Sequence, residues 1–119
     1  MSTILVVDDE PDLRHLLRIF FERAGHEVVV AGQGLAALEA AHRTPPDLVV
    51  TDIMMPVMDG VELIRRLRSD PVTARIPILA VTGDPHLASA ADTVISKPYR
   101  RDQLLAAADA LLAQKADNT

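Results

Sequence analysis

The 119-residue chain is long enough for one compact domain and too short for two, and its formal net charge is -5. It has no cysteine, which excludes disulfide bonds and thiolate chemistry, and no apolar run approaches the length of a membrane span. The acidic balance and the lack of a dense lysine and arginine cluster argue against direct nucleic-acid binding. We therefore expect residues 1–119 to form a single domain without membrane contact, located by default in the cytoplasm.

The first apolar run, Ile4–Val7, predicts a buried strand, and three acids follow it directly: Asp8, Asp9 and Glu10. Acids near a helix N-terminus can serve as caps, and Pro11 opens a helical pattern at this point. A cap needs only one acid. The run of three therefore favours a functional role for Asp8 and Asp9, and less so for Glu10.

The helical spacing after Pro11 continues to Ala24, where Gly25 supplies a stop. Glu27–Ala31 follows as a strand, and a second helix is expected from Leu35 to about His42.

The stretch around Asp52 is the most informative part of the chain. Leu48–Val50 indicates a strand buried on both faces, because a β-branched run without polar alternation suits a parallel sheet covered by helices. Asp52 falls at the carboxyl end of this strand, the edge at which open α/β sheets place ligands and chemistry. A loop over Ile53–Asp59 leads to a helix from about Gly60 to Ser69.

Two further strands complete the alternation of strands and helices. Ile78–Val81 stops at Thr82, and the brief strand Thr93–Ile95 is followed by Lys97. Alternating strands and helices with short connections predict a parallel sheet with helices on both faces.

The connection between these two strands is unusually short. Only the ten residues Gly83–Asp92 separate Thr82 from Thr93, which leaves room for one or two helical turns at most. A final helix is expected from Arg101 to about Gln114, with Lys115–Thr119 frayed.

Helical spacing also predicts which side chains face the core and which face solvent. Among the residues expected to face inward are Leu13, Leu16, Leu17 and Phe20 of the first helix, Leu35 and Leu38 of the second, and Val61, Ile64 and Leu67 of the third. The neighbouring Arg65, Arg66 and Arg68 are expected on a solvated face.

Right-handed crossovers bring the carboxyl ends of parallel strands to one edge, so Asp8, Asp9, Asp52, Thr82 and Lys97 should converge there. Three carboxylates at close range repel one another by several kcal/mol per pair at an effective dielectric constant of about 20, unless a cation lies among them. All-oxygen ligation favours Mg²⁺, with Mn²⁺ as a second possibility. A lysine and a hydroxyl beside the metal suit phosphoryl oxygens, and the Asp52 carboxylate would be the nucleophile.

Together these motifs resemble the receiver domain of bacterial two-component response regulators. The segments that carry the resemblance are Ile4–Glu10, Asp52–Gly60, Thr82–Gly83 and Lys97–Pro98. It implies a flavodoxin-like, doubly wound parallel sheet of five strands in the order 2-1-3-4-5. It also implies a phosphodonor that is a sensor histidine kinase or a phosphotransfer protein, and a downstream protein target that the sequence does not name.

The resemblance also assigns roles to individual residues. Asp52 would be the phosphoacceptor, and the metal ligands would be Asp9, Asp52 and the Met54 backbone carbonyl, with Asp8 as an outer acidic partner. Thr82 would bind the phosphoryl group, Lys97 would pair with it, and the Lys97–Pro98 peptide bond would be cis.

The chain departs from the family pattern at two places that would relay phosphorylation to an interaction surface. Receivers usually carry an aromatic residue three positions before the lysine, where this chain has Val94, and they have a full fourth helix where this chain has the short Gly83–Asp92 connection. We expect that helix to be stunted or absent.

Two alternatives to a phosphorylated signalling module remain open. A magnesium-dependent phosphatase acting through an aspartyl-phosphate would want an acid two residues after its nucleophile, where this chain has Met54. Turnover of a separate substrate is therefore not expected. A pseudo-receiver that binds partners without phosphorylation is disfavoured by the intact acids, threonine and lysine.

Overall fold

The computed structural model describes residues 2–88 and 90–117, and strands and helices alternate along it. Within these residues no helix combines the length and apolarity needed to cross a bilayer. In chain order the elements are β1 (Thr3–Val7), α1 (Pro11–Arg23), β2 (Glu27–Ala31), α2 (Gly34–Arg43), β3 (Leu48–Asp52), α3 (Gly60–Ser69), β4 (Ile78–Thr82), the 3₁₀ helix η1 (Pro85–Ala88), β5 (Thr93–Ser96) and α4 (Arg101–Asp117).

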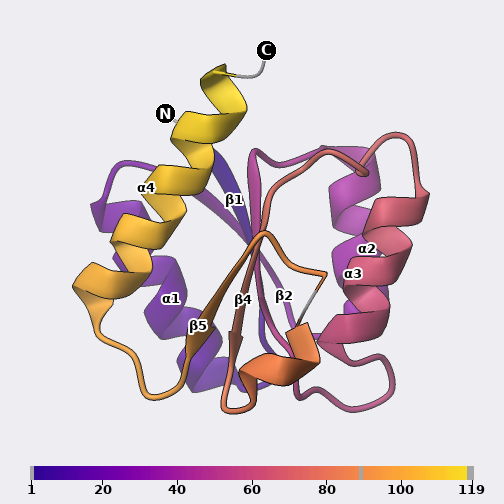
Figure 1. The fold of residues 1–119 in the computed structure, drawn as a ribbon, viewed down its shortest axis with the longest axis horizontal. Coiled ribbons are helices and arrows are strands. Elements are labelled where there is room, and N and C mark those ends of the chain that lie inside the picture. Colours follow the sequence, from indigo (N-terminus) through magenta and orange to yellow (C-terminus); the bar gives the residue numbers. More distant parts are fainter. Residues whose placement is uncertain (1, 89, 118–119) are drawn as a thin grey trace.

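The five strands form one parallel sheet in the order β2-β1-β3-β4-β5. Figure 1 shows the sheet between two helical layers, with α1 and α4 on one side and α2 and α3 on the other. The flavodoxin-like prediction is confirmed in both strand order and strand direction.

A separate apolar cluster fills each side of the sheet. Alternate residues of β1 show the division: Leu5 belongs to the cluster under α2 and α3, whereas Ile4 belongs to the cluster under α1 and α4. Every residue of the central strands β3 and β4 is buried, as expected for strands covered on both faces.

Some residues predicted to face the core lie instead at the border of the buried helix face. Leu16 is 41% exposed, Leu35 is 52% exposed and Val61 is 41% exposed, so the prediction of burial was wrong for these three. Phe21 and Leu63 are fully buried in α1 and α3. Helical spacing gives the width of an apolar stripe, but the packing partner decides which part of the stripe is covered.

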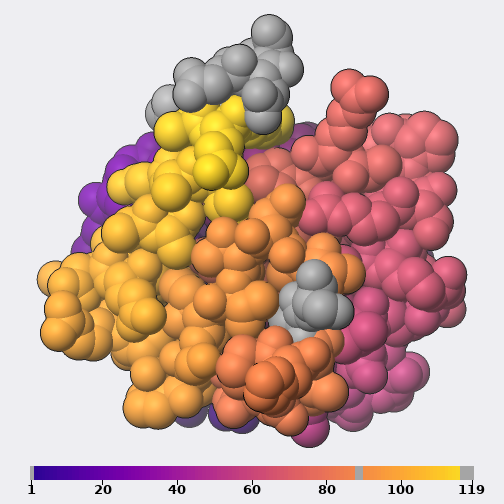
Figure 2. Space-filling model, in the orientation of Figure 1, coloured from indigo at the N-terminus to yellow at the C-terminus, as the bar shows by residue number. Residues whose placement is uncertain are grey.

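The connection between β4 and β5 holds one short 3₁₀ helix, Pro85–Ala88, as predicted from its length; residue 89 lies outside the described residues. In Figure 2 residues of this connection and of β5 form the surface between α4 and α3.

Arg68 holds this short connection in place and is not part of a solvated face, which corrects the prediction for this arginine. Its guanidinium donates to the carbonyls of Ala74 (3.1 Å) and Ile76 (2.8 Å) and pairs with the carboxylate of Asp92. The same carboxylate accepts a hydrogen bond from the Ile78 amide at 2.7 Å. By contrast, Arg65 and Arg66 pair with Glu62 along the solvent side of α3.

The C-terminal helix is longer than predicted. It runs to Asp117, and Lys115, expected to be frayed, places its ammonium 2.9 Å from an oxygen of Asp47. The other oxygen of Asp47 accepts from the Thr3 amide at 2.8 Å. Residues 118 and 119 lie outside the described residues.

Candidate functional site

Four of the five parallel strands end beside a residue predicted for the site. Asp8 follows β1 directly, Asp52 is the last residue of β3, Thr82 is the last residue of β4, and Lys97 follows β5. Because the strands are parallel, these positions lie at the same edge of the sheet.

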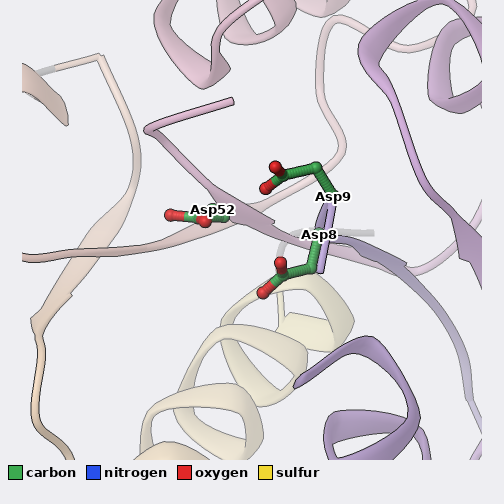
Figure 3. Close-up of side chains that lie close together, drawn as sticks. All are labelled: Asp8, Asp9 and Asp52. Carbon is green, nitrogen blue, oxygen red and sulfur yellow. The ribbon is translucent and has the colours of Figure 1, made fainter. Parts of the chain in front are cut away.

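Asp8, Asp9 and Asp52 come together at this edge. Each offers a carboxylate oxygen, and the three oxygens lie within 4.8 Å of one another. Figure 3 shows the three carboxylates extending toward one shared space. Asp8 is 3% exposed and Asp52 6% exposed, while Asp9 is half-buried. At such separations each pair of ionised groups repels by roughly 3 kcal/mol at an effective dielectric constant of about 20.

Asp8 is held by hydrogen bonds from three sides. Its Oδ1 accepts from the Glu10 amide (2.9 Å), its own amide donates to the Ala31 carbonyl (3.2 Å), and its carbonyl accepts from the Arg14 guanidinium (3.0 Å). Burial raises the pKa of Asp8, and the charges of Asp52 and Asp9 raise it further. The Glu10 amide and Lys97 oppose this shift without cancelling it.

Asp52 forms an ion pair with Lys97. Lys97 places its ammonium 3.4 Å from Asp52 Oδ1, so the predicted lysine does reach the predicted acceptor. The geometry is that of an ion pair only, because Oδ1 is buried and makes no hydrogen bond within the described residues. A buried carboxylate oxygen without a hydrogen-bond donor is costly in free energy unless another positive group completes its surroundings.

Thr82 is fully buried, and its hydroxyl is engaged by the turn that follows β4. The hydroxyl oxygen accepts from the Asp84 amide at 3.1 Å. The hydroxyl therefore lies at the strand end predicted from the sequence, but it is held there by a hydrogen bond from the turn after β4. The Lys97–Pro98 peptide bond is cis, as the resemblance implied.

The loop after β3 is closed tightly against the strand. The Gly60 amide donates to the Ile53 carbonyl at 2.8 Å, and Asp59 caps α3 by accepting from the Glu62 amide at 2.9 Å. A Cβ at position 60 would lie 2.5 Å from the Asp52 carbonyl oxygen, so only glycine fits there. Met54, within this loop, has a side chain that is 65% exposed.

Tyr99 belongs to the site but was missed from the sequence. It lines a cavity of about 520 Å³ together with Asp8, Asp52 and Lys97. Apolar side chains of α1 also line this cavity: Leu13, Leu16, Leu17 and Phe20. Burial raises the pKa of the Tyr99 phenol, and the charges of Asp8 and Asp52 raise it further. Its position two residues after Lys97 was the sequence feature from which its place in the site could have been predicted.

The residues of the site fit a divalent cation. Three carboxylates supply hard oxygen ligands, and the buried Asp52 Oδ1 lacks a hydrogen-bond donor among the described residues. Mg²⁺ prefers such oxygen ligands and retains open positions for water or phosphate oxygens.

Comparison with known proteins identifies the same kind of domain. A family model described as the response regulator receiver domain matches residues 4–109. The DNA-binding response regulator MtrA of Mycolicibacterium smegmatis is 36% identical over 121 residues, which cover 96% of this chain and 52% of MtrA. The chain spans about half the length of the curated relatives it matches.

Solved structures agree in fold along most of the chain. Chemotaxis response regulator CheY4 of Vibrio cholerae superimposes with a TM-score of 0.87 at 29% identity, covering 93% of this chain and 98% of CheY4. Response regulator TrrA of Thermotoga maritima, solved in complex with Mg²⁺-BeF, gives a TM-score of 0.85 at 34% identity, covering 93% and 99%.

The family match covers most of the chain, and the acids and lysine that the family motif places at strand ends meet here at one edge of the sheet. The chain therefore belongs to the receiver domains of response regulators, the phosphoryl-accepting modules of two-component signalling.

Proposed function

We propose that Asp52 is the phosphoacceptor and that Lys97 and Thr82 assist the transfer. The observation that carries this proposal is the buried Asp52 Oδ1, which lies 3.4 Å from Lys97 without a hydrogen bond from any described residue. The Asp52 carboxylate is largely buried and lies beside the Lys97 ammonium, so an incoming phosphoryl group would meet a nucleophilic oxygen and a neutralising charge together.

In the transfer, an Asp52 oxygen forms a bond to phosphorus while the bond from phosphorus to the donor's leaving atom breaks, and the leaving group takes the electron pair. Lys97 neutralises charge on the phosphoryl oxygens. The Thr82 hydroxyl binds the transferred group after releasing the Asp84 amide, which couples the phosphorylated state to the β4–η1 turn.

Asp9, Asp52 and the Met54 carbonyl would hold Mg²⁺, or Mn²⁺, with Asp8 as an outer acidic partner. A cation held there would supply positive charge to neutralise phosphoryl oxygens. If this is correct, Mg²⁺ raises the melting temperature of the wild-type chain, because a ligand of the native state alone stabilises that state. Asp9→Ala should remove most of the increase, whereas Asp12→Ala, at an exposed acid in the first turn of α1, should leave it unchanged.

The test of phosphorylation is intact-mass spectrometry after incubation with Mg²⁺ and acetyl phosphate. The wild-type chain should gain the mass of one phosphoryl group, Asp52→Asn should gain none, and the matched control Asp12→Asn should behave as wild type. Equal labelling of Asp52→Asn would refute the assignment. Absence of labelling in the wild type would favour the pseudo-receiver alternative.

The proposed partners are a histidine kinase or phosphotransfer protein as phosphodonor and a downstream protein as target. A phosphatase of separate substrates is disfavoured, because Met54 places no acid-base group two residues after Asp52. The expected lack of nucleic-acid contact has no support from the comparisons, since MtrA is named as DNA-binding. A cytoplasmic location and a single domain over residues 1–119 stay predictions.

A further inference from the structure

Strand β2 is an edge of the sheet that nothing in the described part of the chain covers. Its inner flank pairs with β1, and its outer flank presents unpaired backbone groups. Val29 is 43% exposed and Val30 36% exposed, in contrast to the fully buried β3 and β4. Natural edge strands are usually protected by lysine, proline or a bulge. Here Glu27, at the start of the strand, is the one charged residue.

The two exposed valines lie on opposite faces of the sheet. Val29 alternates with Ala31, which packs in the cluster under α2 and α3, whereas Val30 alternates with Val28, which packs against the cluster under α1 and α4. A partner docking on one face of the sheet would cover only one of them. A strand added alongside β2 would cover both.

The sequence of β2 is complementary to itself in an antiparallel pair. When Val29 lies opposite Val29 on a two-fold axis, Val28 lies opposite Val30 and Glu27 lies opposite Ala31. This register places valines against valines and puts no like charges opposite each other.

The same register places the one charge of β2 beside a helix end that lacks an acid. Helix α2 starts three residues after Ala31, its N-cap Gln33 makes no side-chain capping bond, and its first turn holds no acidic residue. In the described part of the chain the Glu27 carboxylate has neither an ion pair nor a hydrogen bond. In the antiparallel pair, Glu27 of one copy lies on the α2 side of the sheet beside the free amides of that turn in the other copy, an arrangement that the helix dipole favours.

We propose that β2 pairs with β2 of a second copy of this chain, which extends the two sheets into one across a two-fold axis. This interface lies at the outer edge of β2 and does not use the phosphoacceptor site.

Sedimentation velocity over a range of concentrations tests the assembly. The wild-type chain should form a concentration-dependent dimer, and Val29→Lys should weaken the association at least tenfold because two ammonium groups would meet on the axis. The matched control Val72→Lys changes an exposed valine (47%) in the turn after α3, and it should dimerise as wild type does. A wild-type chain that is monomeric throughout, or a Val29→Lys chain of unchanged affinity, would overturn the proposal.

Cross-linking tests the register, because the chain contains no cysteine. Opposed residues on the axis of an antiparallel pair have Cα atoms about 4.5 to 5.5 Å apart, within reach of a disulfide. Under mild oxidation Val29→Cys should form a covalent dimer, and Val72→Cys should not. A wild-type dimer in which Val29→Cys fails to cross-link, or cross-links no better than Val72→Cys, would place the interface elsewhere and refute the pairing.

Discussion

A single residue of the site, Asp8, lowers the stability of the native chain at neutral pH. Its pKa is raised by burial and by the neighbouring carboxylates, so the native chain binds a proton at Asp8 more readily than the unfolded chain does. As pH rises from the ordinary aspartate value of 3.8 through the raised native value, the contribution of Asp8 to the free energy of unfolding falls. Above that pH window Asp8 is ionised in both the native and the unfolded state, and the full free-energy cost of its buried charge remains.

We therefore expect metal-free Asp8→Asn to be more stable than wild type at neutral pH, by roughly 1 to 3 kcal/mol. The asparagine oxygen can still accept the Glu10 amide, so the change removes charge and keeps the turn. The difference in melting temperature should shrink as the pH falls toward about 4. A variant less stable than wild type at neutral pH would show that repulsion is not the dominant effect.

Val57 carries backbone strain in the loop that follows Asp52. Its φ is 68° and its side chain is fully exposed, so a β-branched residue occupies the left-handed region without any packing to compensate. Val57→Gly should raise the free energy of unfolding by about 0.5 to 1 kcal/mol in urea denaturation, since relief of strain exceeds the added entropy of the unfolded chain. Val72→Gly, at an exposed turn residue of ordinary φ, should lower it.

The sequence predicted most of the site at this scale. Asp8, Asp52 and Lys97 follow from one rule, that polar residues at the carboxyl ends of parallel strands meet at one edge. Tyr99 and the strain at Val57 were not predictable in this way, because both depend on how a loop folds back onto the sheet.

At the scale of elements, a polar network holds the Gly83–Asp92 connection, where receivers usually carry a full helix between the fourth and fifth strands. The length of the Gly83–Asp92 connection was enough to predict at most one or two helical turns, but it did not predict which contacts hold the connection in place. The ion pair between Arg68 and Asp92 joins residues far apart in the sequence, and periodicity within one helix carries no information about such a contact. For the same reason Arg68 was wrongly assigned to a solvated face together with Arg65 and Arg66.

Removal of the Asp92 carboxylate should loosen this connection. Asp92→Ala leaves the Ile78 amide and the Arg68 guanidinium without this acceptor. We therefore expect the free energy of unfolding, measured by chemical denaturation, to fall by about 1 to 3 kcal/mol. Amide exchange at residues 83–92 should become faster. Asp92→Asn keeps an acceptor and should lose less. Asp102→Ala breaks an exposed pair with Arg100 and an exposed hydrogen bond from the Gln103 amide, and it should change stability little. An equal loss there would contradict the role given to Asp92.

At the scale of the whole molecule, Asp47 joins the two ends of the described chain. It accepts from the Thr3 amide at the start of β1 and pairs with Lys115 near the end of α4. The Thr3 amide contributes most to lowering the pKa of Asp47, and Lys115 lowers it further. Fraying of α4 was predicted from local composition, and this contact between distant segments explains why the prediction failed.

Asp47 should contribute to acid denaturation with the opposite sign to Asp8. Because its native pKa lies below 3.8, the unfolded chain binds its proton first, and the stability that Asp47 supplies is lost as the pH falls through that value. Asp47→Asn should therefore show a shallower fall in melting temperature between about pH 6 and pH 3 than wild type. The effect should be modest, since both partners are partly exposed; an unchanged slope would exclude Asp47 as a source of acid sensitivity.

The closed ring formed by the Gly60 amide and the Ile53 carbonyl has an evolutionary consequence. It anchors both ends of the segment between them to the sheet, while the side chains of Met54 and Val57 extend outward into water. Exchange of these two side chains can alter what an approaching molecule meets beside Asp52 while Asp52 itself stays in place. Substitutions in this segment can therefore change the surface offered to a partner without moving the carboxylates at the edge of the sheet.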